Sequence, residues 1–273
     1  VIDFSKATKT VEYYHMNIGF YSLFLKDINC GDLKYGRNYY DYQEVTVVCM
    51  APGQVIGIDN RKKTPQRTKS IGVLFHPDLI RGTSLGQNIK NYSFFSYEVN
   101  EALHLSDQEK EIVTDCIHKI QIELEHAIDK HSKQLIVRNI ELLLDYCMRF
   151  YERQFITRNQ VNKDIIVRFE HLLDEYFQGQ VALTEGLPSV KYFADKVCLS
   201  PNYFGDLIKK ETGKTAQEYI QCRIIELAKE RILEGSQTVS QIAYELGFQY
   251  PQHFSRLFKK HVGYTPNEYK QQN

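Results

Sequence analysis

LSPNYFGDLIKKETGKTAQEY (Leu199–Tyr219) and FQYPQHFSRLFKKHVGYTPNEY (Phe248–Tyr269) are two copies of one pattern in this 273-residue chain. At a spacing of fifty residues the copies share aromatic, aliphatic, basic, glycine and capping positions: Phe204 with Phe254, Leu207 with Leu257, Lys209 and Lys210 with Lys259 and Lys260, Gly213 with Gly263, Thr215 with Thr265, Glu218 with Glu268, and Tyr219 with Tyr269. Internal repetition indicates one structural unit used more than once. Two copies are too few for a solenoid, so they predict a pair of like modules with one task.

Each copy carries the signals of a helix that follows a tight turn. Proline stands at the expected start of each helix, as Pro201 and Pro251, and glycine at its end, as Gly213 and Gly263. A shorter helix is predicted before each turn, and residues 163–273 read as helical throughout. A short helix, a tight turn and a second helix with basic residues form the helix-turn-helix pattern.

A long helix is predicted between the two copies. Thr215 and Glu218 form a capping box that opens it, and its apolar face continues to about Leu233. At 1.5 Å per residue such a helix is about 28 Å long. Successive major grooves on one face of B-DNA lie about 34 Å apart, so this helix can hold two recognition helices near one turn of DNA apart.

The first half of the chain has different periodicities. Residues 1–105 contain short β-branched and aromatic runs between Gly, Pro, Asn and Asp, which predict an antiparallel sandwich or barrel; these runs are Phe20–Lys26, Tyr39–Met50, Val55–Asp59, Ile71–Phe75 and Phe94–Val99. Apolar residues at helical spacing follow from Ser106 and predict two long helices in an antiparallel hairpin. The predicted organisation is therefore a sheet domain at 1–105, a hairpin at 106–156, a polar linker at 157–163 and a helical domain at 164–273.

Amino-acid composition gives less information about the class of protein than the internal repeat gives. The chain has 34 basic and 34 acidic residues, so any contact with DNA must be local. No apolar run is long enough for a membrane helix, no signal-peptide pattern is present, and six scattered cysteines without a CxxC pair favour a reduced, cytoplasmic compartment. We expect most of these cysteines to be small buried apolar residues. Because the chain begins with Val1 rather than Met, we also expect residues before it.

The C-terminal part resembles the AraC/XylS family of bacterial transcription regulators. The second copy, with Gly247 before it, fits the family pattern GFxxxxYFSRxFKKxxGxTPxxYR at Gly247, Phe248, Phe254, Ser255, Arg256, Phe258, Lys259, Lys260, Gly263, Thr265, Pro266 and Tyr269. It departs at His253, where Tyr is frequent, and at Lys270, where Arg is frequent. The match covers about 100 residues. The resemblance implies an α+β protein of several domains: an N-terminal cupin-like antiparallel β-barrel with a helical hairpin, and an all-α C-terminal domain with two helix-turn-helix motifs joined by a long helix.

By this resemblance, the second helix of each module enters the major groove. The candidate DNA-binding residues are Ser200, Asn202, Gly205, Asp206, Lys209 and Lys210 in the first module, and Gln252, His253, Arg256, Lys259 and Lys260 in the second. Gln suits adenine and Arg suits guanine, whereas the lysines and Ser200 suit phosphate. Each of them also fits an ordinary solvated surface. Gly205 has no side chain and Asp206 repels phosphate, so we expect the second module to read more of the sequence.

The resemblance also implies partners: double-stranded DNA, a small-molecule effector in the barrel, a second copy of the chain bound through the hairpin, and RNA polymerase. Two alternatives are kept. A cupin-type metalloenzyme needs clustered metal ligands, but residues 1–105 contain only His15, His76 and His104 and no HxH pair, so we expect no metal, no cofactor and no enzyme activity. A ligand-independent DNA-binding protein would leave the roughly 160 residues before the helical domain without a task.

Overall fold

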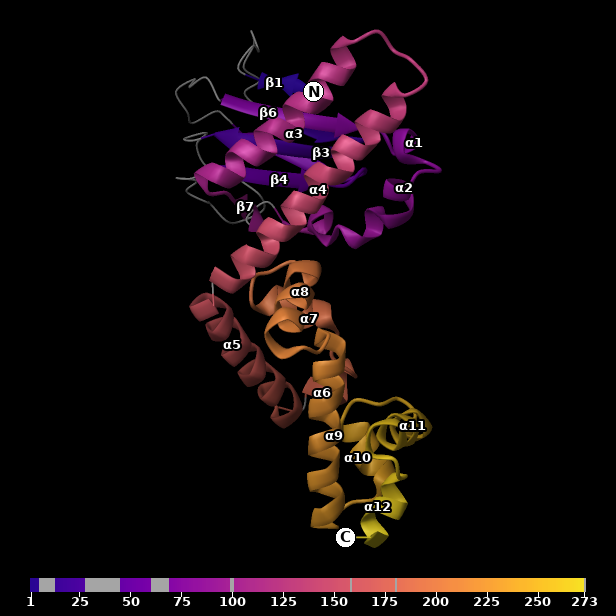
Figure 1. Cartoon of the computed structure of the whole chain (residues 1–273). Coiled ribbons are helices and arrows are strands. Elements are labelled where there is room, and N and C mark those ends of the chain that lie inside the picture. Colours follow the sequence, from indigo (N-terminus) through magenta and orange to yellow (C-terminus); the bar gives the residue numbers. More distant parts are fainter. Residues whose placement is uncertain are drawn as a thin grey trace. The chain divides into compact units, whose positions relative to one another are not determined.

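The computed structural model describes residues 1–4, 13–27, 45–59, 69–98, 101–157, 159–179 and 181–272 (Figure 1). The chain divides into two compact units, Val1–Thr157 and Arg158–Asn273, which are treated separately below. We call them the N-terminal unit and the C-terminal unit.

The N-terminal unit is built on an antiparallel sheet. Its five strands lie in the order β1-β6-β3-β4-β7, and a separate ribbon pairs β2 with β5. The strands are β1 (Ile2–Asp3), β2 (Tyr13–Asn17), β3 (Tyr21–Asp27), β4 (Thr46–Met50), β5 (Val55–Asp59), β6 (Lys69–Phe75) and β7 (Leu103–His104). β4 has the sequence TVVCM and is buried at every residue, as expected for a β-branched strand inside a sheet. Leu23 on β3 pairs with Cys49 on β4 and with Val73 on β6, which places these residues at the centre of the sheet.

The antiparallel sheet is confirmed, but the closed barrel is not. Within the described residues, β1 and β7 are the two edges of the larger sheet, and the β2–β5 ribbon is not paired to it. The predicted polar loop at 60–70 lies outside the described residues up to position 68, and positions 69 and 70 belong to β6. Residues 39–44 of a predicted strand also lie outside them.

One predicted strand is wrong. Phe94–Val99 was expected to be extended, but Ser93–Ser96 forms the 3₁₀ turn η3, and Val99 lies outside the described residues. Phe94 and Phe95 are adjacent and both 3% exposed, whereas a strand would point them to opposite faces. The turn brings both rings into one aromatic core, with Phe94 stacked on Tyr151 at 5.4 Å. Between β6 and η3 lie α1 (Pro77–Ile80), α2 (Ser84–Asn88) and the 3₁₀ turn η2 (Ile89–Asn91).

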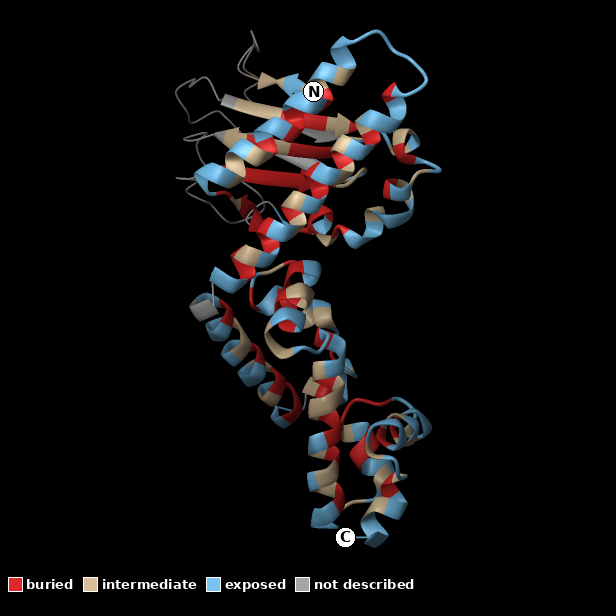
Figure 2. Ribbon diagram, in the orientation of Figure 1, coloured by how far each residue is buried: buried red, intermediate tan, exposed pale blue. Residues whose placement is uncertain are grey.

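The helical hairpin follows the sheet, as the sequence predicts. It consists of α3 (Asp107–Glu125) and α4 (Ser132–Thr157), which pack against each other. The predicted capping box of Ser106 and Glu109 opens α3. Buried residues recur at helical spacing along both helices (Figure 2), and both helices cross the same face of the sheet (Figure 1). α4 therefore covers one face of the sheet with its apolar side.

Three cysteines of this unit behave as small apolar residues. Cys49, Cys116 and Cys147 are each at most 4% exposed. Burial raises the pKa of each thiol, because the charged thiolate is poorly solvated there. Cys198 is exposed and Cys222 half-buried, so these two depart from the expectation, and Cys30 lies outside the described residues.

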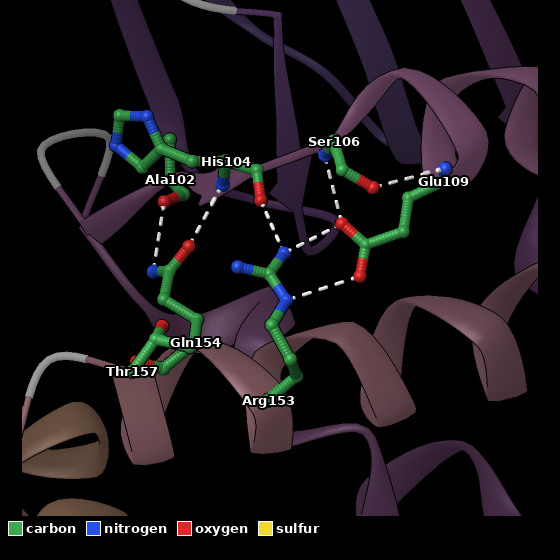
Figure 3. Close-up of polar contacts among 7 residues, drawn as sticks. All are labelled: Ala102, His104, Ser106, Glu109, Arg153, Gln154 and Thr157. Carbon is green, nitrogen blue, oxygen red and sulfur yellow. Dashed lines mark hydrogen bonds and ion pairs between the residues drawn. The ribbon is translucent and has the colours of Figure 1, made fainter.

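A polar network attaches the last turns of α4 to the edge strand β7 (Figure 3). Gln154, 2% exposed, accepts the His104 backbone N–H at 2.8 Å and donates to the Ala102 carbonyl at 3.2 Å. Arg153 donates to the His104 carbonyl at 2.6 Å and forms a two-pronged ion pair with Glu109 at 2.7 and 3.0 Å. The outer side of β7 thus finds its hydrogen-bond partners on α4 and not on another strand.

We expect Gln154→Leu to destabilise the N-terminal unit by about 2–4 kcal/mol, because two backbone groups lose their partners in a buried place. Chemical unfolding of the full chain measures the loss. Thr157→Val is the matched control, since Thr157 is exposed and its hydroxyl donates to the Gln154 carbonyl of the same helix, away from β7. A Gln154→Leu protein as stable as wild type would show that the network contributes nothing.

The C-terminal unit is entirely helical in its described residues. Its helices are α5 (Asn159–Gln178), α6 (Val181–Glu185), α7 (Val190–Lys196), α8 (Pro201–Thr212), α9 (Ala216–Glu234), α10 (Val239–Glu245), α11 (Pro251–Val262) and α12 (Pro266–Gln272). We call α7 and α8 the first helix pair, and α10 and α11 the second. Phe169 meets Phe193 and Phe204, each at 5.1 Å, in the core beside the first pair. Phe254 lies between Phe248 and Phe258 in the core of the second.

The predicted linker 157–163 is mostly helix. α4 continues to Thr157 and α5 begins at Asn159, so only Arg158 lies between them. Polarity misled the sequence prediction here, because Asn162 is buried, 1% exposed, and its amide donates to Glu211 of α8 at 3.1 Å. A polar side chain that finds a buried partner can belong to a packed helix.

Candidate nucleic-acid interface

Helix α11 has two distinct faces. Its inner face carries Phe254 and Phe258, both fully buried. The opposite face consists of five exposed residues predicted as DNA contacts: Gln252, His253, Arg256, Lys259 and Lys260. Their spacing of one, three and four residues is that of a single helix face. Hydrogen-bonding side chains therefore lie toward the start of this face and lysines toward its end.

Helix α8 has the same division with fewer side chains suited to base reading. Asn202, Lys209 and Lys210 are exposed, whereas Gly205 and Asp206 are half-buried. A Cβ added at Gly205 would meet nothing within 4 Å, so the surface is open at this point. The second pair thus presents Gln252 and Arg256 where the first presents Asn202 and Asp206.

Ser200 is not part of this surface. It is 3% exposed, and its hydroxyl accepts the Tyr203 backbone N–H at 3.2 Å as the N-cap of α8. A hydroxyl that accepts a capping bond keeps its own O–H as a donor, so the phosphate contact of Ser200 stays a prediction. The cap itself follows from the Ser-Pro sequence, as expected.

The turns before α8 and α11 differ in length. Aligning the two copies at a spacing of fifty residues does not reveal this difference, because that spacing applies only from the turns onward. Val190 begins α7 and Val239 begins α10, a spacing of 49, whereas Pro201 and Pro251 are separated by 50. The second turn therefore has one more residue. Among the described residues, Cys198 is the one non-glycine residue with a positive φ, at 61°. It occupies the position in the first turn that Gly247, with φ 89°, occupies in the second.

The extra residue places Tyr250 at the start of α11, a candidate that the sequence analysis missed. Tyr250 is 61% exposed and makes no side-chain capping bond. Its ring lies 5.5 Å from the imidazole of His253, at an angle of 64°. An exposed aromatic residue directly before the helix proline was the signal that could have revealed it.

Two exposed glutamates hold the capping boxes after α8 and α11. Glu218 accepts the Thr215 backbone N–H at 2.8 Å, and Glu268 accepts that of Thr265 at 2.7 Å. These hydrogen bonds lower the pKa of both carboxyls below their ordinary value of 4.5, and nearby lysines lower it further. Charged carboxylates at helix N-termini also suit the helix dipole.

These shifts predict an acid-sensitive contribution to stability. A pKa lowered by folding stabilises the fold above the unfolded value, and this contribution is lost as the pH falls below about 4.5 through the folded pKa. We expect the melting temperature of the protein to fall across that window. The Glu218→Gln/Glu268→Gln protein keeps neutral acceptors and should show a smaller fall. Parallel falls in both proteins would contradict this role.

Two further features of the described residues concern a histidine and the grouping of metal-ligand side chains. His76, one of the three histidines of residues 1–105, is the N-cap of α1 and accepts the Asp78 backbone N–H at 3.2 Å. Among the residues that the structure describes, no three His, Cys, Asp or Glu side chains are grouped to hold a metal ion. No helix within the described ranges is both long and apolar enough to cross a membrane.

Comparison with known proteins places the chain in a family. A family model described as a helix-turn-helix domain matches residues 193–272. The transposon Tn10 TetD protein of Escherichia coli is 33% identical over 144 residues, which are 52% of this chain and 91% of TetD. The chain belongs to the AraC/XylS family of bacterial transcription regulators. The residues matched by the family model include α8 and α11, where the exposed faces described above lie.

Two further similar proteins match over shorter lengths. The uncharacterized transcriptional regulatory protein YesN of Bacillus subtilis is 38% identical over 85 residues, 30% of this chain and 23% of YesN. The C-terminal domain of AraT, a response regulator from Geobacillus stearothermophilus, is 25% identical with a TM-score of 0.36, covering 40% of this chain and 85% of that one. Several curated relatives besides TetD are spanned over only 13 to 54% of their lengths.

Proposed function

We propose that this protein regulates transcription by binding specific DNA sequences through two helix-turn-helix motifs, the first and second helix pairs. The observation that carries the proposal is the exposed face of α11, where base-reading side chains precede two lysines on one side of a helix anchored by buried Phe254 and Phe258. Family membership supports the same function.

The distance that α9 sets between the two helix pairs suits adjacent major grooves on one face of B-DNA. Nineteen residues of α9 lie between them, which corresponds to about 28 Å of helix. Successive major-groove segments are about 34 Å apart. Two recognition helices mounted on this helix can therefore enter adjacent grooves together, with less entropy lost than if a flexible linker joined them.

The side chains assign unequal tasks to the two pairs. Arg256 suits the O6 and N7 of guanine, and Gln252 the N6 and N7 of adenine. Asn202 is the exposed residue of α8 with similar capacity, whereas Asp206 can at most accept from cytosine. The paired lysines at the ends of α8 and α11 would contact phosphates, although cations also stabilise a helix C-terminus without DNA.

We propose that the N-terminal unit is a sensor. Its antiparallel sheet would belong to a cupin-like β-barrel that binds a small-molecule effector, and the hairpin of α3 and α4 would join two copies of the chain in a cytoplasmic dimer that acts on RNA polymerase. The antiparallel sheet with a helical hairpin on one face supports this assignment. An effector regulates DNA binding only if its affinity differs between two states of the protein.

Selection of DNA from a randomised library by the purified full chain tests the proposed function. We expect one enriched sequence and an affinity that falls steeply with salt, because each neutralised phosphate releases counterions. Repeating the selection with small metabolites tests the sensor. An absence of enrichment together with affinity that does not depend on salt would contradict DNA binding.

A further inference from the structure

The two helix pairs share α9 as a common support (Figure 1). α8, α10, α11 and α12 pack against α9, and side chains of α9 bond α5. α5 runs parallel to α9, with Tyr219 bonded to Glu170 and Arg223 paired with Asp174 at 2.8 Å one turn later. A helix of this length fixes the distance between the pairs, but the tilt of the second pair on it depends on further contacts.

Arg231 makes such contacts near the end of α9. Its Nη1 lies 3.1 Å from Oε2 of Glu245 on α10, and its Nη2 donates to the Phe177 carbonyl of α5 at 3.5 Å. Phe177 is in the last turn of α5, where helix carbonyls have no partner within the helix. The planar guanidinium can serve both acceptors at once. Gln237 holds the other carboxylate oxygen of Glu245, so the acceptor is itself fixed.

A backbone contact joins the same two parts a second time. An added Cβ at Gly247, in the turn between α10 and α11, would lie 2.6 Å from the carbonyl carbon and oxygen of Gly186. Gly186 follows α6, and its carbonyl accepts the Tyr176 hydroxyl of α5 at 2.9 Å. The turn that leads into α11 therefore rests directly on the segment between α6 and α7.

We propose that Arg231, with Glu245 and the Gly186–Gly247 contact, forms a clamp that sets the position of α11 relative to α8 and thereby fixes the spacing of the two DNA elements that the protein accepts. This inference rests on the proposed function. Arg231 is a positioning residue in it and touches no DNA. One added base pair moves the second element by about 3.4 Å and rotates it by about 35°, because B-DNA has about 10–10.5 base pairs per turn. A clamped frame cannot follow that movement, whereas a loosened one can.

The test measures how binding depends on spacing. The probe is a duplex selected by the wild-type protein from a randomised library, together with versions that have one base pair added or removed between its two elements. We expect the wild-type protein to lose at least about 30-fold in affinity on either change, because one set of contacts is lost. We expect Arg231→Met, which keeps the apolar stem, to lose less than about 5-fold and to bind the unchanged duplex within about 10-fold of wild type.

Lys229→Met is the matched control. Lys229 lies on the same helix, and among the described residues its ion pair is with Glu226 of that helix, at 2.8 Å, so its loss removes one positive charge without loosening the clamp. We expect the control to retain the spacing penalty of wild type. Glu245→Gln weakens the same link with almost no change of shape and carries the test if Arg231→Met fails to fold.

The outcomes separate this inference from the proposed function. A spacing penalty that is equal in wild type, Arg231→Met and Glu245→Gln overturns the clamp, while the sequence preference of the wild-type protein keeps the proposed function intact. A relaxed spacing in Lys229→Met as well would also overturn the clamp, because charge alone would then explain it. A wild-type protein that selects no DNA sequence overturns both.

Discussion

Gly247→Ala is expected to lower the free energy of unfolding of the C-terminal unit by about 2–5 kcal/mol. Gly247 has φ 89°, where a Cβ costs about 1–2 kcal/mol. The same Cβ would come within 2.6 Å of the Gly186 carbonyl and 2.9 Å of the Leu187 nitrogen, and forcing atoms into a packed place costs about 1–3 kcal/mol more. Both neighbours are backbone atoms and cannot move aside as a flexible side chain would.

Thermal unfolding, together with hydrogen exchange of the α10 and α11 amides, measures this loss. Gly263→Ala is the control, because Gly263 also has φ 89° but an added Cβ there meets nothing within 4 Å. It should lose only the conformational part, about 1–2 kcal/mol. Equal losses in the two variants would show that the contact with Gly186 does not stabilise the unit.

Arg256→Ala is expected to weaken binding to the selected duplex by about 5- to 150-fold, which corresponds to about 1–3 kcal/mol, and to relax the preference at one base position. Arg256 is exposed in the middle of the polar face of α11, one turn beyond Gln252. Asn202→Ala on α8 should cost less, because Gly205 and Asp206 beside it add little to base reading. Titrations with labelled duplexes that differ at single base pairs measure both effects.

Arg149→Ala provides the control for charge, since Arg149 is an exposed arginine on α4 of the N-terminal unit. Its affinity for the selected duplex should match wild type. If Arg256→Ala binds like wild type while Asn202→Ala abolishes binding, the ranking of the two helix pairs is reversed.

Most of the C-terminal unit could be predicted from sequence because its helix ends have explicit chemical signals. Pro201 and Pro251 start their helices, and Gly213 and Gly263 end theirs with positive φ. Such signals act within a few residues and therefore do not depend on the rest of the fold. α6 and the early start of α5 were missed because they depend on contacts between distant residues, such as Asn162 with Glu211.

The candidate interface could be predicted only in part, for a similar reason. Spacing on a helix identifies the exposed residues of α11. It cannot show that the Ser200 hydroxyl accepts a capping hydrogen bond from the Tyr203 backbone N–H. Alignment of the two copies at fifty residues hid the extra residue that places Tyr250 at the start of α11. The role of Arg231 has no local signal, because its partners are 14 and 54 positions away in sequence.

In the N-terminal unit, runs of β-branched residues correctly predict strands. The aromatic run around Phe94 also predicts a strand, but this prediction is wrong. Aromatic side chains favour strands on average, yet adjacent rings that share one core need a turn. The pairing order of the sheet, with β6 between β1 and β3, also lies beyond what spacing alone predicts.

Footprinting of the purified protein on its selected duplex tests the central claim most directly. We expect two protected major-groove segments on one face of the DNA, separated by about 10 base pairs, with base-specific contacts concentrated in the segment bound by α11. Protection of a single segment, or of no defined segment, would contradict the account of two helix pairs held on one frame.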